Sequence, residues 1–226
     1  QLCLPAPSLP QVRITLRTDD RGVVQDANVT QRALGGSGTW PMDLELLVFG
    51  EDGARRMLRV STDSASAPIP ELIGEPEPAC VVANPQDIAY GQFVPDTTSA
   101  AWLLANVQDE ADPLVRASAT AALYEAVREA ELDPARFAKA AITMVQRERD
   151  PDTHRWLLSR LSTCLDRYLD EQQAAPLRTA TTELLLQQLK DESDSGRELG
   201  TFRFLATSSN HPGVMELCRD LVANTN

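Results

Sequence analysis

The chain has 226 residues, of which 42% are hydrophobic and 24% are charged, so it has globular proportions and enough apolar side chains for a core. Its net charge of −12 excludes a general nucleic-acid binder and a ligand for anionic lipids, because both need a basic surface. Its apolar runs are only a few residues long, so no segment is expected to insert into a membrane.

The first part of the chain is expected to form short strands. Val12, Ile14 and Leu16 alternate with polar residues, which is the period-two pattern of a half-buried strand. A Gly-Glu-Asp-Gly turn at residues 50–53 ends a later strand. The expected strands cover residues 12–17, 29–33, 44–49, 57–62, 68–73 and 79–83. Short strands at this spacing, with no helix between them, predict a small antiparallel β-sandwich or barrel.

The remainder of the chain has the apolar spacing of helices. Asp112, Asp133 and Asp150 each precede a proline, which places a good N-cap directly before the residue that best tolerates the first helical position. Two further helix starts are expected at Ala175-Pro176 and His211-Pro212. Apolar stripes support three of the helices and consist of Phe137, Ala138, Ala141, Ile142 and Val145; Leu157, Leu161, Cys164, Leu165 and Tyr168; and Val214, Leu217, Cys218, Leu221 and Val222.

These patterns predict an α+β multidomain fold. An N-terminal extension at residues 1–9 is followed by a β-sandwich domain at 10–94 and by an α-helical domain at 95–226. The second domain is expected to be an irregular solenoid of six or seven antiparallel helices, in the style of HEAT and ARM helical hairpins. The apolar residues Ile88, Tyr90, Phe93 and Val94 indicate a packed junction between the two domains more than a free linker.

Two clusters suggest ligand binding but have simpler explanations. Gly35–Gly38 could cradle a phosphate, yet no Lys-Ser/Thr pair follows, so a flexible loop between strands is favoured. Asp109, Glu110 and Asp112 could hold a cation, yet acids around a helix end and an N-cap are more simply a solvated connection. Neither cluster is therefore predicted to be a site.

The histidines and cysteines limit the chemistry of the chain. His154 is expected to be exposed in the first turn of a helix and His211 to lie at a helix entry, and neither has a partner at catalytic spacing. No HExxH or CxxC sequence occurs. Cys164 and Cys218 fall on apolar stripes and are expected to be reduced core residues. The residues predict no catalytic, cofactor-binding or metal-binding site, so the chain alone is not expected to be an enzyme.

Several segments occur in an order that is informative as a set. Trp40-Pro41 enters a strand, an Asn-x-x-x-x-x-Tyr segment runs from Asn84 to Tyr90, and Asp-Pro-Leu-Val-Arg-Ala at residues 112–117 opens a helix. In order and separation they resemble the C-terminal half of the M1-family zinc aminopeptidases, the aminopeptidase N group. The resemblance runs from about Pro10 to at least Leu169.

The resemblance implies that the chain is a non-catalytic part of a larger enzyme. The HExxH, GxMEN and proton-donating tyrosine motifs of the family's catalytic domain are absent, and Tyr90 lies in the domain junction instead. The parent would remove N-terminal residues from peptides and would carry the zinc, with no cofactor in this chain. The implied partners are the missing N-terminal catalytic domain of the same polypeptide and, in the parent, peptides. The helical domain would cover the active site and shape peptide access.

Two other functions remain open from the residues themselves. A free-standing helical-repeat scaffold could bind a peptide or protein in its concave face, and a natural start near Gln1 would favour it. An independent hydrolase that uses scattered acids is disfavoured by the shortage of histidine and of nucleophile motifs.

The composition also bears on the origin of the chain. Only Lys139 and Lys190 are lysines among the 21 basic residues, and this arginine bias suggests a GC-rich bacterial genome. The isolated cysteines do not form the dense disulfide framework of a small secreted domain, so a cytoplasmic location is expected.

Overall fold

The computed structural model describes residues 8–191 and 195–224, and the chain divides into two compact units. The first unit extends to Leu132 and the second begins at Asp133. Open sheets of four and three strands precede seven α-helices in the described residues, which confirms the predicted α+β class and shows no closed barrel. No helix within the described ranges combines the length and hydropathy that crossing a bilayer would require.

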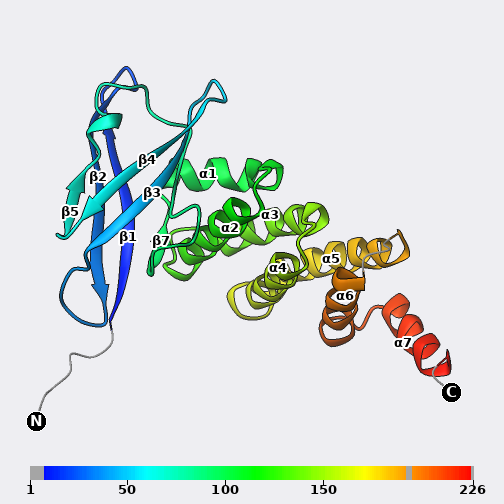
Figure 1. Ribbon diagram of the computed structural model, residues 1–226. Helices are drawn as coiled ribbons and strands as arrows, with labels where there is room; N and C mark the ends of the chain where they lie inside the picture. The colour runs from blue at the N-terminus through cyan, green and yellow to red at the C-terminus, as the bar shows by residue number, and fades with distance from the viewer. Residues whose placement is uncertain (1–7, 192–194, 225–226) are drawn as a thin grey trace, which may run out of the picture. The chain divides into compact units, whose positions relative to one another are not determined.

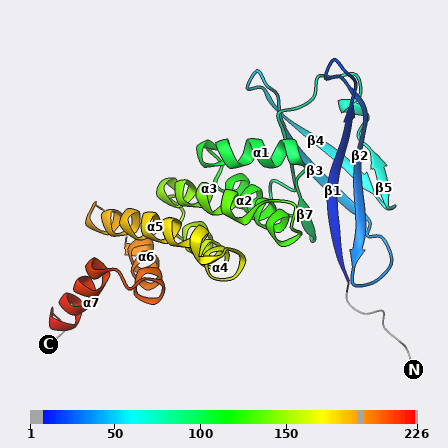
Figure 2. The ribbon, with the colours of Figure 1, turned by 180° about the vertical axis from the view of Figure 1, so that it is seen from behind.

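The first unit is built on two facing sheets (Figures 1 and 2). One has the strand order β5-β2-β1-β7 and the other β4-β3-β6. Every pair is antiparallel except β1 with β7, which is parallel. The strands are β1 (Leu9–Thr18), β2 (Val24–Leu34), β3 (Met42–Phe49), β4 (Arg55–Thr62), β5 (Ser66–Pro68), β6 (Cys80–Ala83) and β7 (Gln92–Val94). The sequence pattern did not predict β7.

The period-two pattern of the strands explains the core between the sheets. Val12 and Val29 face inward from the four-stranded sheet, and Leu44 and Leu46 face inward from the three-stranded sheet. All four side chains are buried in one hydrophobic cluster. The unit is therefore a β-sandwich, and its outer faces also bury some side chains, among them Gln11 on β1 and Leu47 on β3.

The predicted strand at residues 68–73 is wrong for most of its length. Strand β5 ends at Pro68, and a 3₁₀ turn, η1 (Pro70–Leu72), takes the place of the rest. Pro68 and Pro70 have no backbone N–H, so a ladder could not continue through both. Ile69 between them still donates its N–H to the Ala27 carbonyl at 2.8 Å, which ties the turn to β2.

Two helices complete the first unit. Helix α1 (Thr97–Asn106) packs near β6, and α2 (Pro113–Arg128) packs near β7, with the 3₁₀ turn η2 (Val107–Asp109) between the helices. The Asp96 carboxylate accepts a hydrogen bond from the Ser99 N–H at 2.9 Å and caps α1. The Asp112 carboxylate accepts one from the Leu114 N–H at 2.9 Å and caps α2, which confirms the Asp-Pro prediction there.

The second unit is helical throughout its described residues. Its elements are α3 (Pro134–Arg147), α4 (Pro151–Thr163), a π-helical turn η3 (Cys164–Tyr168), α5 (Glu171–Asp191), α6 (Ser195–Ser208) and α7 (Pro212–Asn224). Asp133 and Asp150 cap α3 and α4 as predicted. Helix α4 contacts α3 and α6, and α5 contacts α3 and α6, so alternate helices stack as in a helical-hairpin solenoid (Figure 1).

The predicted helix start at Ala175-Pro176 is wrong. Helix α5 begins at Glu171 and Pro176 lies inside it. The Asp170 carboxylate accepts a hydrogen bond from the Gln173 N–H at 2.8 Å, and its carbonyl accepts one from the Ala174 N–H at 2.8 Å. Aspartate is a much better N-cap than alanine, so the helix starts one turn earlier and tolerates the proline.

The predicted domain boundaries, 10–94 and 95–226, remain predictions. The change from strand to helix does fall between β7 and α1. The first compact unit nevertheless includes α1 and α2 together with the two sheets.

Candidate functional site

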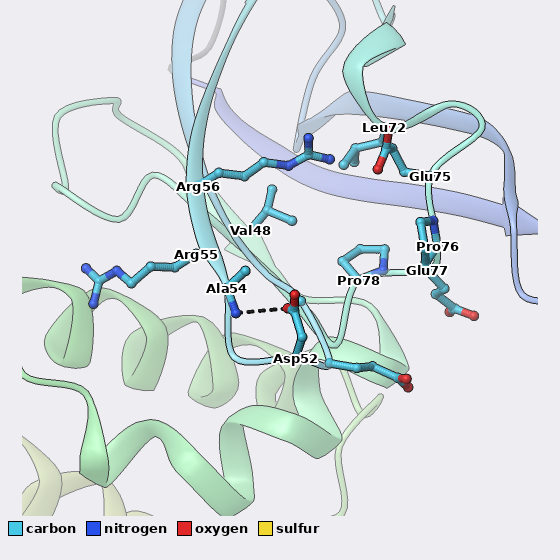
Figure 3. Close-up of a pocket in the computed structure, with 12 residues that line it drawn as sticks. Val48, Asp52, Ala54, Arg55, Arg56, Leu72, Glu75, Pro76, Glu77 and Pro78 are labelled. Carbon is cyan, nitrogen blue, oxygen red and sulfur yellow. Dashed lines mark hydrogen bonds between the residues drawn. The ribbon is translucent and has the colours of Figure 1, made fainter.

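A cavity of about 480 Å³ lies beside the β3–β4 hairpin in the first unit (Figure 3). Its floor is apolar, since Val48 and Leu72 are buried there and Pro78 lies beside them (Figure 3). The hairpin forms one wall, and the segment from Leu72 to Pro78 forms the other. The cavity therefore has the apolar base that small-molecule or side-chain binding usually needs.

Local turn chemistry positions both walls of this cavity. Gly53 has φ 81°, which suits glycine, and the Asp52 carboxylate accepts a hydrogen bond from the Ala54 N–H at 2.9 Å (Figure 3). The opposite segment is joined to β2 through the N–H of Gly74, which donates to the Val24 carbonyl at 2.8 Å. Val24 in turn donates to the Glu75 carbonyl at 2.9 Å, so backbone hydrogen bonds in both directions join the second wall to β2.

The polar part of the cavity is mostly acidic. Four carboxylate residues line it, namely Glu51, Asp52, Glu75 and Glu77. The two arginines in the lining have partners: Arg55 pairs with Glu110 at 3.1 Å, and Arg56 donates to the Glu71 carbonyl at 3.3 Å. Among these lining residues there is no thiol, hydroxyl or imidazole, so the cavity could hold a cationic group but contains no activated nucleophile.

A second groove, of about 350 Å³, lies over β3 and β4 next to the loop at residues 84–91. Its charged residues have partners within the groove. Arg59 lies 3.0 Å from Glu45, and the Ser61 hydroxyl donates to the Asp43 carboxylate at 2.5 Å. Ile88 lines the groove from the loop.

The loop at 84–91 exposes two large apolar side chains. Ile88 is 77% exposed and Tyr90 is 79% exposed, whereas Ala89 between them packs against the sandwich core. The predicted packed junction is therefore wrong for Ile88 and Tyr90, while Val94 is buried as expected. These two apolar side chains lie on the surface of the first unit instead, because the loop backbone directs them outward.

Buried Asn84 holds this loop in one conformation. Its side-chain oxygen accepts hydrogen bonds from the N–H groups of Ile88 and Ala89, both at 2.9 Å, and its amide donates to the Ala89 carbonyl at 2.9 Å. Asn84 has φ 56°, a left-handed conformation that asparagine adopts more readily than most residues. At the other end, a Cβ on Gly91 would lie 3.1 Å from the Pro10 carbonyl oxygen, so the loop packs closely on β1.

A buried polar network that sequence reasoning missed connects β1, β7 and α2. Gln11 and Gln92 are 1% and 4% exposed, and the Gln11 amide donates to the Gln92 side-chain oxygen at 2.6 Å. The Gln92 amide donates to Glu125 at 2.5 Å and to Glu129 at 3.2 Å. Hydrogen bonds from Gln11 and Gln92, together with the charge of Arg32, hold the pKa of Glu129 below its usual range. Every polar group here is paired, so the network fastens the helix to the sheet.

The clusters considered from the sequence lie in connections between elements, although the Glu110 side chain is only 7% exposed and not solvated as expected. Gly35–Gly38 forms the connection between β2 and β3. Asp112 is the α2 cap, and Glu110 accepts hydrogen bonds from Arg55 and from the Asp112 N–H. His211 lies at the entry to α7, where its Nδ1 accepts the Gly213 N–H at 3.2 Å, as expected for a helix-entry residue.

The prediction that His154 is exposed is wrong, because its side chain is 0% exposed. His154 precedes Leu157, Leu158 and Leu161 by three, four and seven positions, so it lies on the buried face of α4. This spacing is visible in the sequence, but the prediction of exposure gave more weight to the place of His154 in the first turn of the helix. Neither ring nitrogen has a hydrogen-bond partner within the described residues. Burial, with a smaller contribution from Arg197, lowers the pKa of His154 to about 4.

The cysteines in the described residues are free thiols. Cys80 and Cys164 are buried, and Cys218 is half-buried. Burial raises the pKa of both Cys80 and Cys164 to about 12, so each stays a neutral thiol at neutral pH. The core prediction for Cys164 is confirmed, whereas Cys218 is only partly covered.

Comparison with known proteins places these features in context. No family model matches the chain. The chain is similar to an aminopeptidase N of Streptomyces lividans, with 24% identity over 227 residues that cover 95% of this chain. It spans 26% of the length of that relative. The similarity fits a part of an aminopeptidase N, in agreement with the resemblance that the ordered motifs indicated.

Proposed function

We propose that the chain is the non-catalytic C-terminal part of an M1-like zinc aminopeptidase, an enzyme that removes N-terminal residues from peptides. The proposal rests on the similarity to an aminopeptidase N, which covers 95% of this chain and about a quarter of the length of that relative. The ordered Trp-Pro, Asn84–Tyr90 and Asp-Pro segments support the same assignment.

The chain's own residues do not fit a zinc site. Of its two histidines, His154 lies on the buried face of α4, and His211 accepts a hydrogen bond at the entry to α7. Within the described residues, no three His, Cys, Asp or Glu side chains gather as metal ligands. Zinc and the catalytic residues would therefore belong to another part of the same polypeptide, which is the partner of this chain.

In the parent enzyme, the helical residues would cover the active site and limit entry to short or unfolded peptides. A stack of helices such as α3–α7 offers an extended surface suited to this role. The net charge of −12 would also attract the positively charged N-terminus of a peptide. A bacterial, cytoplasmic peptidase fits the arginine bias and the free, buried thiols.

The test is an activity assay on the natural polypeptide that contains this chain. We expect aminoacyl p-nitroanilide cleavage that chelation abolishes and added zinc restores, and much faster N-terminal trimming of a tripeptide than of a folded protein. The 226-residue chain alone should cleave neither substrate. A natural polypeptide without such activity, or cleavage by the isolated chain that survives chelation, would contradict the proposal.

A peptide- or protein-binding scaffold is the second candidate, and the exposed Ile88 and Tyr90 favour it. The assay above separates the two. If the natural polypeptide has no peptidase activity, the scaffold function becomes the leading one.

A further inference from the structure

We propose that the Ile88–Tyr90 surface, defined as the loop 84–91 and the adjoining groove residues Asp43, Glu45, Arg59 and Ser61, is where an apolar face of the catalytic part of the same polypeptide docks. This inference rests on the proposed function. It names the face that the larger part of the enzyme covers.

The first argument is the exposure of two neighbouring apolar side chains. Ile88 and Tyr90 are the most exposed large hydrophobic residues described in the chain, at 77% and 79%. A single exposed apolar residue is common, but here one short loop exposes both an isoleucine and a tyrosine, two positions apart. Tyrosine at the centre of a contact is also a frequent source of binding free energy.

The second argument is that the surface is already arranged for binding. The three hydrogen bonds of Asn84 and the close packing of Gly91 on β1 leave the loop little freedom. Ala89 anchors the loop to the core from between the two exposed residues. A partner that docks here would therefore lose little loop entropy, which raises affinity without any added contact.

The third argument concerns the chemistry of the partner. In the groove, Arg59 pairs with Glu45, and Ser61 donates to Asp43, so these charged groups have partners before anything binds. The loop adds one exposed carboxylate, that of Asp87. The cavity beside the β3–β4 hairpin differs, because four carboxylate residues line it. A basic peptide would suit that cavity, whereas the Ile88–Tyr90 surface suits an apolar protein face with few charges.

The last argument identifies where such a face comes from. The chain spans 26% of the length of the aminopeptidase N that it resembles, so about three quarters of a comparable enzyme lies outside it. A partner tethered in the same polypeptide has a high effective concentration, so a compact apolar surface is enough to hold it.

Tyrosine nitration with tetranitromethane tests the proposal, because the described tyrosines differ sharply in exposure. In the isolated chain Tyr90 should react fastest, and Tyr124, buried in α2, should react slowly and report any unfolding. In the natural longer polypeptide we expect the reaction of Tyr90 to slow by about tenfold, as for a surface that opens only transiently. Equal rates at Tyr90 in the two forms would overturn the proposal.

Matched substitutions add a second readout. Ile88→Asp and Tyr90→Asp should leave the melting temperature of the isolated chain unchanged, because both side chains are already exposed. In the longer polypeptide they should increase tryptic separation of this chain from the remainder. Ile73→Asp changes another exposed isoleucine of the first unit, 47% exposed and outside both grooves in their described lining, and should have no such effect. Equal behaviour of all three variants would contradict docking at this surface.

The two proposals fail in distinguishable ways. A longer polypeptide with zinc-dependent peptidase activity but a fully reactive Tyr90 overturns the docking surface and leaves the proposed function intact. A polypeptide without peptidase activity overturns the proposed function, and the docking inference fails with it.

Discussion

Two sets of buried polar side chains, one in each unit, differ in their hydrogen bonding. In the first unit, Gln11 and Gln92 lie in the interior with each amide hydrogen-bonded across β1, β7 and α2. In the second unit, both ring nitrogens of His154 and the Thr201 hydroxyl are buried without a hydrogen-bond partner in the described residues. A buried polar group without a partner costs about 1–3 kcal/mol, so the paired glutamines add specificity to the first unit, whereas His154 and Thr201 cost the second unit stability.

The largest loss of stability should come from substitutions in the apolar cores. These substitutions also test whether the two units unfold independently. Leu46→Ala should destabilise the first unit by about 2–5 kcal/mol, because this fully buried side chain fills the space between the sheets. Leu161→Ala in α4 is the matched change in the second unit. Hydrogen exchange measured by peptide mass should show each loss of protection confined to its own unit. A shared loss would show that the units unfold together.

Acidification should weaken the second unit selectively. His154 has a pKa of about 4 in the folded protein against 6.5 unfolded, so the unfolded state takes up the proton first as the pH falls. Stability is complete above pH 6.5 and should fall by about 3 kcal/mol as the pH drops to 4, with no further contribution from this group below that. Urea unfolding followed by hydrogen exchange in α4 peptides measures the slope.

The same pH experiment has two informative variants. His154→Phe should flatten the slope between pH 6.5 and 4, because it removes the group that titrates there. His211→Phe, at the entry to α7, should leave the slope in α4 unchanged. An unchanged slope in His154→Phe would mean that another group controls the acid sensitivity of the second unit.

Breaking the polar network should have an intermediate effect. Gln92→Met keeps the side-chain volume but removes the donor to Glu125 and Glu129 and the acceptor of Gln11. We expect a loss of about 2 kcal/mol in the first unit, because the remaining buried groups lose their partners. Chemical denaturation is the measurement. No change in stability would show that water replaces the glutamine.

The smallest expected effect is a gain in the stability of the second unit, whereas the core and network substitutions above reduce stability. Thr201→Val removes a buried hydroxyl that has no hydrogen-bond partner among the described residues, so stability should rise by up to about 1 kcal/mol. Thr181→Val is the matched control, because the Thr181 hydroxyl donates to the Leu177 carbonyl at 2.7 Å and its loss should destabilise slightly. Shifts in melting temperature of opposite sign would confirm the contrast, and a loss of stability in both variants would contradict it.

Features set by neighbours along the chain were predictable. The alternation of Val12, Ile14 and Leu16 defined a strand. Asp112, Asp133 and Asp150 cap their helices because each carboxylate and the backbone N–H that donates to it lie within one turn. Even the failed strand at 68–73 had a local cause, since Pro68 and Pro70 were visible. The order of the motifs also anticipated the similarity to an aminopeptidase N.

Features that depend on distant residues were decided only by the tertiary structure. His154 is buried in a structure in which α4 packs against α6, and the lowered pKa that follows from this burial cannot be predicted from a local sequence pattern. Gln11 and Gln92 are 81 positions apart, and only the parallel pairing of β1 with β7 brings their amides together. Composition predicted that Ile88 and Tyr90 would be buried, but the turn held by Asn84 directs both outward. Local hydrogen bonds and apolar periodicity depend on residues that are close in the sequence, so they can be predicted from it. The burial of a side chain depends on which distant residues the fold packs against it.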